Sequence, residues 1–190
     1  MKERYVRDIK AGFPYPIAAS FVRLFTDECL DPSALRLQHI LATAEAAARF
    51  LGVLVLCECR EHFEGRAAAA PLGLSADFNV RFMRITWGSW LHFAREGLKW
   101  LQHSQADLIV EELSRFWFEA SPRENEGPKA LGQLLSIRNQ LSHAGLQPLH
   151  QNDFKALCEQ AYPLLERLLE TLEFLLDYEL TFVNQIEVLK

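Results

Sequence analysis

Three polar side chains near the end of one segment have types that suit chemistry at a phosphate group. Arg138, Asn139 and His143 lie in the sequence LLSIRNQLSHAG, residues 134–145, with four residues between the arginine and the histidine. Arginine is permanently charged and binds phosphate oxygens through paired N–H groups. Histidine exchanges protons near neutral pH. Asparagine can donate a hydrogen bond to a phosphate or orient the imidazole, so the three residues form a candidate catalytic group.

This segment resembles the motif of the HEPN family of nucleotide-binding and ribonuclease domains. That motif is an arginine, a polar residue that is often asparagine, a few more residues and a histidine near a helix end, and Arg138, Asn139 and His143 match it. The resemblance implies a metal-independent endoribonuclease that acts as a homodimer, in which two motif helices face each other and the 2′-hydroxyl of RNA is the nucleophile. It also suggests a bacterial toxin or antiviral defence setting, with an antitoxin or a larger defence protein as partner.

The spacing of the motif also bears on how a site could be assembled. At ~100° per residue, Asn139 and His143 share one face of a helix, whereas Arg138 and His143 point ~140° apart. One chain therefore does not easily bring both groups to one phosphate. This favours a composite site made by two chains, or unwinding of the helix near Gly145.

Two other interpretations of the motif stay open. Arginine and histidine are favoured near a helix C-terminus, where they interact with exposed carbonyl groups and with the helix dipole, and Asn139 could make an interhelical hydrogen bond. The second is a catalytically inactive HEPN-like module of a larger signalling or defence protein that dimerises or senses a ligand. The acidic balance of the chain and its β-branched terminal residues favour this second interpretation.

Periodic apolar residues indicate the helices that position the motif. A long first helix is expected from Asp31 and Pro32, an N-cap and first-turn pair, to about Glu61, and Asn152 is expected to cap the last helix. The later helices are expected over residues 86–101, 106–118, 129–143 and 153–178. The pattern predicts an all-α, up-and-down, HEPN-like helical bundle.

The two ends of the chain are expected to differ from the bundle. Pro14 and Pro16 favour an extended N-terminal arm, with a short helix over 17–25. The terminal LTFVNQIEVLK has strand character without an obvious partner. We therefore divide the chain into an arm (1–30), a HEPN-like domain (31–180) and a terminal strand or linker (181–190) that leads to a further domain.

Composition excludes some classes of protein. The 190 residues are 49% hydrophobic and carry a net charge of -5, which argues against a protein that coats nucleic acid through a global positive field. The longest apolar run, Phe50–Cys57, is far shorter than the ~20 residues of a membrane span, and the N-terminus lacks the pattern of a signal peptide. We expect a cytoplasmic protein with reduced cysteines in its core.

Other candidate sites are weaker. Cys57, Cys59 and His62 invite a metal interpretation, but Cys-x-Cys on a helix directs its thiols apart and a fourth ligand is missing; we expect neither a metal nor a cofactor. Glu45 and Arg49 are interpreted as a surface ion pair. The tryptophans of residues 87–100 have core spacing, although they could stack on bases beside Arg81 and Arg84. Phosphate-loop, GxSxG and HExxH motifs are absent from the sequence.

Overall fold

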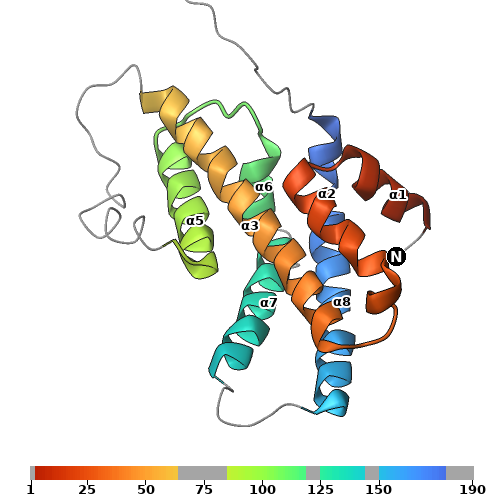
Figure 1. Cartoon of the computed structure of the whole chain (residues 1–190). Helices are drawn as coiled ribbons and strands as arrows, with labels where there is room; N and C mark the ends of the chain where they lie inside the picture. The colour runs from red at the N-terminus through yellow and green to blue at the C-terminus, as the bar shows by residue number, and fades with distance from the viewer. Residues whose placement is uncertain (1–2, 64–84, 119–124, 144–149, 179–190) are drawn as a thin grey trace, which may run out of the picture.

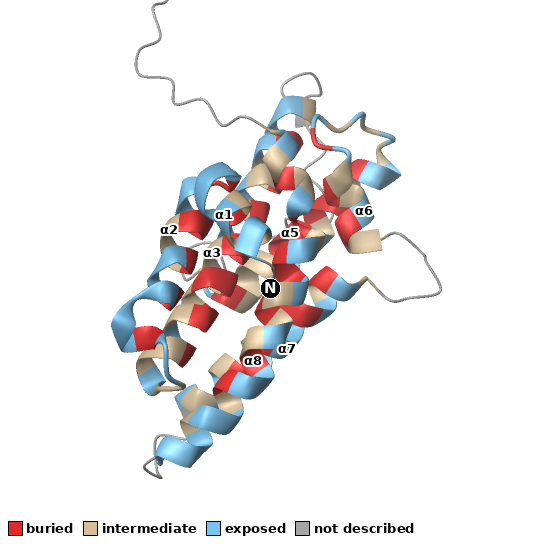
Figure 2. Cartoon of the chain, turned by 90° about the vertical axis from the view of Figure 1, so that its right-hand side faces the viewer, coloured by how far each residue is buried: buried red, intermediate tan, exposed pale blue. Residues whose placement is uncertain are grey.

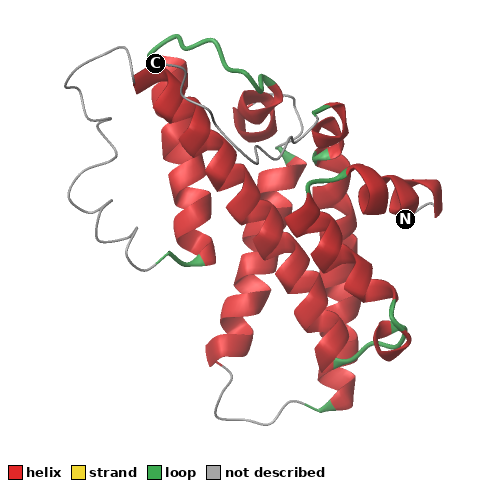
Figure 3. Ribbon diagram, turned by 45° about the horizontal axis from the view of Figure 1, so that its top comes forward, coloured by secondary structure: helices red, strands yellow, loops and turns green. Residues whose placement is uncertain are grey.

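The computed structural model describes residues 3–63, 85–118, 125–143 and 150–178. Every regular element in these ranges is a helix (Figure 3). In chain order the α-helices and the short 3-10 helices (η) are α1 Glu3–Gly12, α2 Tyr15–Val22, η1 Arg23–Phe25, η2 Asp27–Cys29, α3 Ala34–Phe63, α5 Trp87–His103, α6 Glu112–Phe118, α7 Glu126–His143, α8 Gln151–Thr171 and η3 Glu173–Asp177. The predicted all-α helical bundle is confirmed.

The long helix α3 runs through the middle of the bundle, with α5 along one side and α2 along the other (Figure 1). It also packs against α7 and α8. The helix begins after Ser33, whose Oγ accepts a hydrogen bond from the backbone N–H of Arg36 at 3.1 Å. The predicted start at Asp31 and Pro32 is therefore two residues too early, because Ser33 is the residue whose side chain caps a first-turn N–H group of α3.

Helices α3 and α5 run in the same direction. The Cα of Gly52 lies against the indole ring of Trp90, and Gly97 lies against Val55 and Cys59 further along both helices. Glycine lets the two backbones approach closely at these points, because a Cβ at position 52 would stand 2.3 Å from a ring carbon of Trp90. The bundle is thus not antiparallel throughout.

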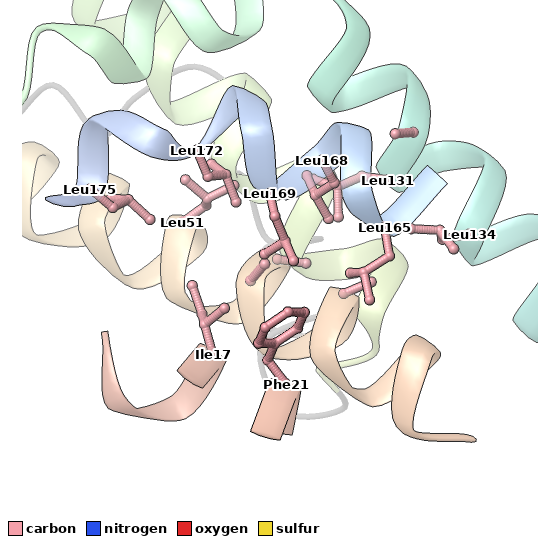
Figure 4. Close-up of a cluster of buried hydrophobic side chains, with 14 of the residues drawn as sticks. Ile17, Phe21, Leu51, Leu131, Leu134, Leu165, Leu168, Leu169, Leu172 and Leu175 are labelled. Atoms are coloured by element: carbon pink, nitrogen blue, oxygen red, sulfur yellow. The ribbon is translucent and has the colours of Figure 1, made fainter. Parts of the chain in front are cut away.

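A single apolar cluster joins the helices (Figure 4). It fills the space between α2, α3, α7 and α8, and its labelled members are Ile17, Phe21, Leu51, Leu131, Leu134, Leu165, Leu168, Leu169, Leu172 and Leu175. All ten side chains are at most 2% exposed. Burial of each leucine-sized side chain contributes about 1.5–3 kcal/mol, so this cluster fixes the placement of α7 against α8.

The N-terminal residues belong to the same core, and the prediction of an extended arm is wrong. Residues 3–12 and 15–22 form α1 and α2. Ile9 and Phe13 are buried in the cluster, and the hydroxyl of Tyr5 donates a hydrogen bond to the carbonyl oxygen of Leu169 at 2.6 Å. Tyr5, Ile9 and Phe13 recur every four residues, which is the period of a helix face. Pro16 lies in the first turn of α2, where the missing N–H costs nothing.

Several predicted boundaries are corrected in the same way. The helix predicted over 106–118 is present only from Glu112, and α8 begins at Gln151. The N-cap of α8 is His150 rather than Asn152, and the carboxylate of Asp153 accepts the backbone N–H of His150 at 2.8 Å. Gly145, near which unwinding of the motif helix was considered, and the predicted terminal strand or linker (181–190) lie outside the described residues.

One described helix meets a criterion for crossing a membrane. Residues Ala34–His62 of α3 include a window of mean hydropathy 1.8, of which half is buried inside the fold. The exclusion of a span from sequence counted only the uninterrupted apolar run, whereas this criterion tolerates isolated charges. A helix at the centre of a globular core passes the same test, and α3 occupies that central place.

Candidate functional site

Helix α7 carries the motif and has two distinct faces (Figure 2). Ala130, Leu131, Leu134 and Ile137 are at most 2% exposed and pack into the core. The opposite side is polar and exposed, and its described members near the motif are Gln133, Ser136, Asn139 and Gln140. The helix is therefore anchored by its apolar face, while its polar face is available to a ligand or a partner.

Arg138 lies at the border between these two faces. Its side chain is half-buried, and within the described part of the chain it makes one weak hydrogen bond, from a terminal guanidinium nitrogen to Oδ1 of Asn139 at 3.4 Å. That distance exceeds the usual range of about 2.7–3.2 Å. Among the described residues no carboxylate pairs with Arg138. The guanidinium thus keeps its capacity to bind an anion.

Asn139 and His143 complete the motif on the same helix. Asn139 is exposed. The backbone of His143 is helical and ends α7, while its side chain lies outside what the structure describes. Because α7 is regular through this turn, with Ser142 Oγ donating to the carbonyl oxygen of Arg138 at 3.1 Å, positions 138 and 143 diverge by ~140° about the helix axis. One chain does not bring the two positions onto a common face.

A cleft of about 320 Å³ lies between α7 and α8, next to the motif. Its lining residues are Gln133, Ser136, Ile137, Gln140, Gln160 and Leu164. Sequence reasoning missed this cleft, although Gln133, Ser136 and Gln140 are spaced three and four residues apart on one helix face. What the sequence could not give was the partner residue from α8, Gln160.

The Cys57–Cys59 segment of α3 has a structural role. Glu58 is 3% exposed and accepts the backbone N–H groups of Ile109 and Val110 at 3.1 and 2.8 Å. Cys57 is exposed, which corrects its expected core placement, while Cys59 is buried. Burial, together with the charge of Glu58, raises the pKa of Cys59 to about 12. No group of three or more potential ligands suited to a metal ion occurs among the residues that the structure describes.

The remaining candidates have structural roles in the described ranges. Trp87 and Phe93 are core residues, at 1% and 7% exposure, and Trp90 packs edge-on against Phe93 with ring centroids 6.4 Å apart. Glu45 and Arg49 form the predicted ion pair at 2.6 Å. Arg81 and Arg84 lie outside the described residues.

Comparison with known proteins gives no relative: no family model, curated protein or solved structure matches the chain. The basis for a function is therefore the motif on α7, with the family resemblance that it carries, and the geometry of its residues.

Proposed function

We propose that this chain is a metal-independent endoribonuclease of the HEPN type, which acts as a cytoplasmic homodimer in a toxin or antiviral defence setting. The observation that supports the proposal most is the state of Arg138. A half-buried guanidinium without a carboxylate partner among the described residues gains interaction energy when a phosphate oxygen binds to it.

The proposed reaction needs no nucleophile from the protein. The 2′-hydroxyl oxygen of a ribose attacks the adjacent phosphorus, and the bond from phosphorus to the 5′-oxygen of the next nucleotide breaks. The imidazole of His143 accepts the proton from the 2′-hydroxyl, and the imidazolium so formed then gives this proton to the leaving 5′-oxygen. The products are a 2′,3′-cyclic phosphate and a 5′-hydroxyl. Arg138 stabilises the negative charge that develops on the phosphate oxygens.

The geometry of α7 explains why two chains are required. The ~140° between positions 138 and 143 directs the arginine and the histidine of one chain to different sides of the helix. In a two-fold dimer with its α7 helices face to face, His143 of each chain meets Arg138 of the partner, and two equivalent sites result.

The first experiment compares RNA cleavage in the presence of a chelator by the wild-type protein, His143→Ala and Arg138→Ala. Removal of a general acid–base typically lowers the rate by 10²–10⁴-fold, so both variants should be strongly impaired. His92→Ala is the matched control, because His92 is exposed on α5 and should leave cleavage unchanged. Cleavage that survives in His143→Ala would reveal a contaminating nuclease and refute the proposal.

The second experiment tests the composite site. The Arg138→Ala and His143→Ala chains are unfolded together and refolded as an equal mixture. Half of the dimers are then mixed, and each mixed dimer contains one complete site, so about one quarter of the wild-type rate should return. No recovery would refute a site shared by two chains. A wild-type dimer that binds RNA without cutting it would instead favour the inactive module.

A further inference from the structure

The cleft between α7 and α8 is chemically unlike the motif beside it. Three glutamines and one serine line it, together with Ile137 and Leu164. Charged residues are missing from this lining, so a phosphate or a metal ion would find no counter-charge there. Its volume of about 320 Å³ is at the lower end of the range of about 300–1,000 Å³ that is typical of small-ligand sites.

The lining matches a flat ring with polar edges. A glutamine amide donates and accepts hydrogen bonds at the same time, and a serine hydroxyl does either. Leu164 is half-buried and offers apolar contact to a ring face, whereas Ile137, which is 2% exposed, adds little accessible surface. A nucleobase presents both kinds of surface, and a glutamine amide pairs in two-point fashion with N6 and N7 of adenine.

The cleft also lies on nearly the same side of α7 as position 143, the proposed catalytic position. Gln140 and Ser136 precede His143 by three and seven residues, which at ~100° per residue places all three positions within ~60° of one another on the helix. The cleft therefore borders the helix face on which residue 143 stands. Arg138 is set towards the core side of α7, away from the cleft.

We propose that this cleft binds one base of single-stranded RNA, adenine above the others, next to the phosphodiester that is cut. The inference rests on the proposed ribonuclease activity and adds base selectivity to it. The amides of Gln140 and Gln160, one from each helix, hold the edges of the base, and its sugar–phosphate backbone continues towards residue 143.

Binding is measured separately from cleavage, with His143→Ala protein and short single-stranded oligomers of adenylate, cytidylate or uridylate. Oligoadenylate should bind roughly tenfold more tightly than the others, since one good two-point contact gives discrimination of that order. When Gln140→Met and Gln160→Met are added to the His143→Ala protein, the preference for oligoadenylate should be abolished. Methionine keeps the length and helix propensity of glutamine but lacks its hydrogen bonds. Gln38→Met is the matched control, since Gln38 is exposed on α3.

The outcomes separate the two proposals. Equal binding of the three oligomers, or a preference that survives the double variant, would overturn the base site even if the wild-type protein cuts RNA. A preference for adenylate that the double variant loses would support the base site even if cleavage is never seen. Adenosine monophosphate is titrated as a further probe; binding as tight as that of the oligomer would overturn placement of the site on an RNA strand.

Discussion

The carboxylate of Glu58 should determine how firmly the segment between α5 and α6 is held. It is the one charged side chain among the described residues that is buried in the core, and both of its oxygens accept backbone N–H groups, from Ile109 and from Val110. One turn later, the Nε2–H of His62 donates to the carbonyl oxygen of Asp107 at 3.0 Å. Three backbone groups of this segment are thus satisfied by side chains of α3.

The cost of removing the carboxylate follows from these contacts. A hydrogen bond to a charged group contributes about 1.5–3 kcal/mol, and a buried donor without a partner costs about 1–3 kcal/mol. In Glu58→Gln the amide oxygen can keep one N–H group, while the amide nitrogen faces the other N–H and cannot accept it. The free energy of unfolding should fall by about 2–3 kcal/mol. Glu58→Ala removes both bonds, and we expect a loss of about 3–5 kcal/mol on the same basis.

The assay is equilibrium unfolding in urea, followed by helical circular dichroism and by tryptophan fluorescence. The midpoint should move to lower urea with little change in slope, because the same surface is exposed on unfolding. Glu61→Gln is the matched control: Glu61 lies on the same helix and is exposed, so its midpoint should stay at the wild-type value. If Glu58→Gln and Glu61→Gln unfold at the same urea concentration, the anchoring role of Glu58 is refuted.

Two further predictions concern packing and pH. Gly52→Ala places a Cβ 2.3 Å from the ring of Trp90, whereas the Cβ of Gly132→Ala meets nothing within 4 Å. Both variants gain helix propensity, so in urea unfolding Gly52→Ala should be less stable than Gly132→Ala by about 1–3 kcal/mol. Equal stability of the two variants would contradict the close approach of Gly52 to Trp90. The hydroxyl of Tyr178 donates to the carboxylate of Glu112 at 2.6 Å, which lowers the pKa of Glu112 and raises the pKa of Tyr178 to about 12. The pair therefore stabilises the fold above the ordinary carboxyl pKa of 4.5 and below the ordinary tyrosine pKa of 10.0, and this contribution is lost as pH falls through the lowered value or rises through the raised one. Thermal unfolding of Tyr178→Phe should differ from wild type most in that window and least outside it, and a difference independent of pH would argue against the bond.

The same contacts show which parts of the fold sequence reasoning can reach. The long apolar patterns of α3 and α8 were sufficient to predict both segments as helices, because the apolar residues of a buried helix face recur within one segment. The helix predicted from Ala106 failed because its first backbone groups bond to Glu58 and His62 instead of to each other. Those partners lie about fifty residues away in the chain, and a local pattern carries no information about them. In the same part of α3, the sequence suggested the thiols of Cys57 and Cys59 as possible metal ligands. The structure shows instead that the carboxylate of Glu58, between them, makes the hydrogen bonds to the rest of the fold.

The candidate site likewise has one part that the sequence could predict and one part that it could not. The motif residues and their angular separation follow from one helix and could be predicted, whereas the cleft requires Gln160 of α8 to lie beside Gln140 of α7. That juxtaposition is produced by the leucine contacts between the two helices, such as those of Leu131 and Leu168. A pattern within α7 alone shows only a polar face, which most surface helices possess.

The position of Arg138 bears on the choice between a catalytic motif and an ordinary helix end. A cation is stabilised by the dipole and the free carbonyl groups of a helix C-terminus, and this effect falls off within the last turn. α7 is helical through His143, so Arg138 lies at least five residues, more than one full turn of ~3.6 residues, before the end. Its carbonyl oxygen already accepts the hydroxyl of Ser142. The helix end therefore accounts for a histidine at 143 but not for the half-buried guanidinium at 138, whose hydrogen bond to Asn139 is long. The proposed phosphate site would account for both residues.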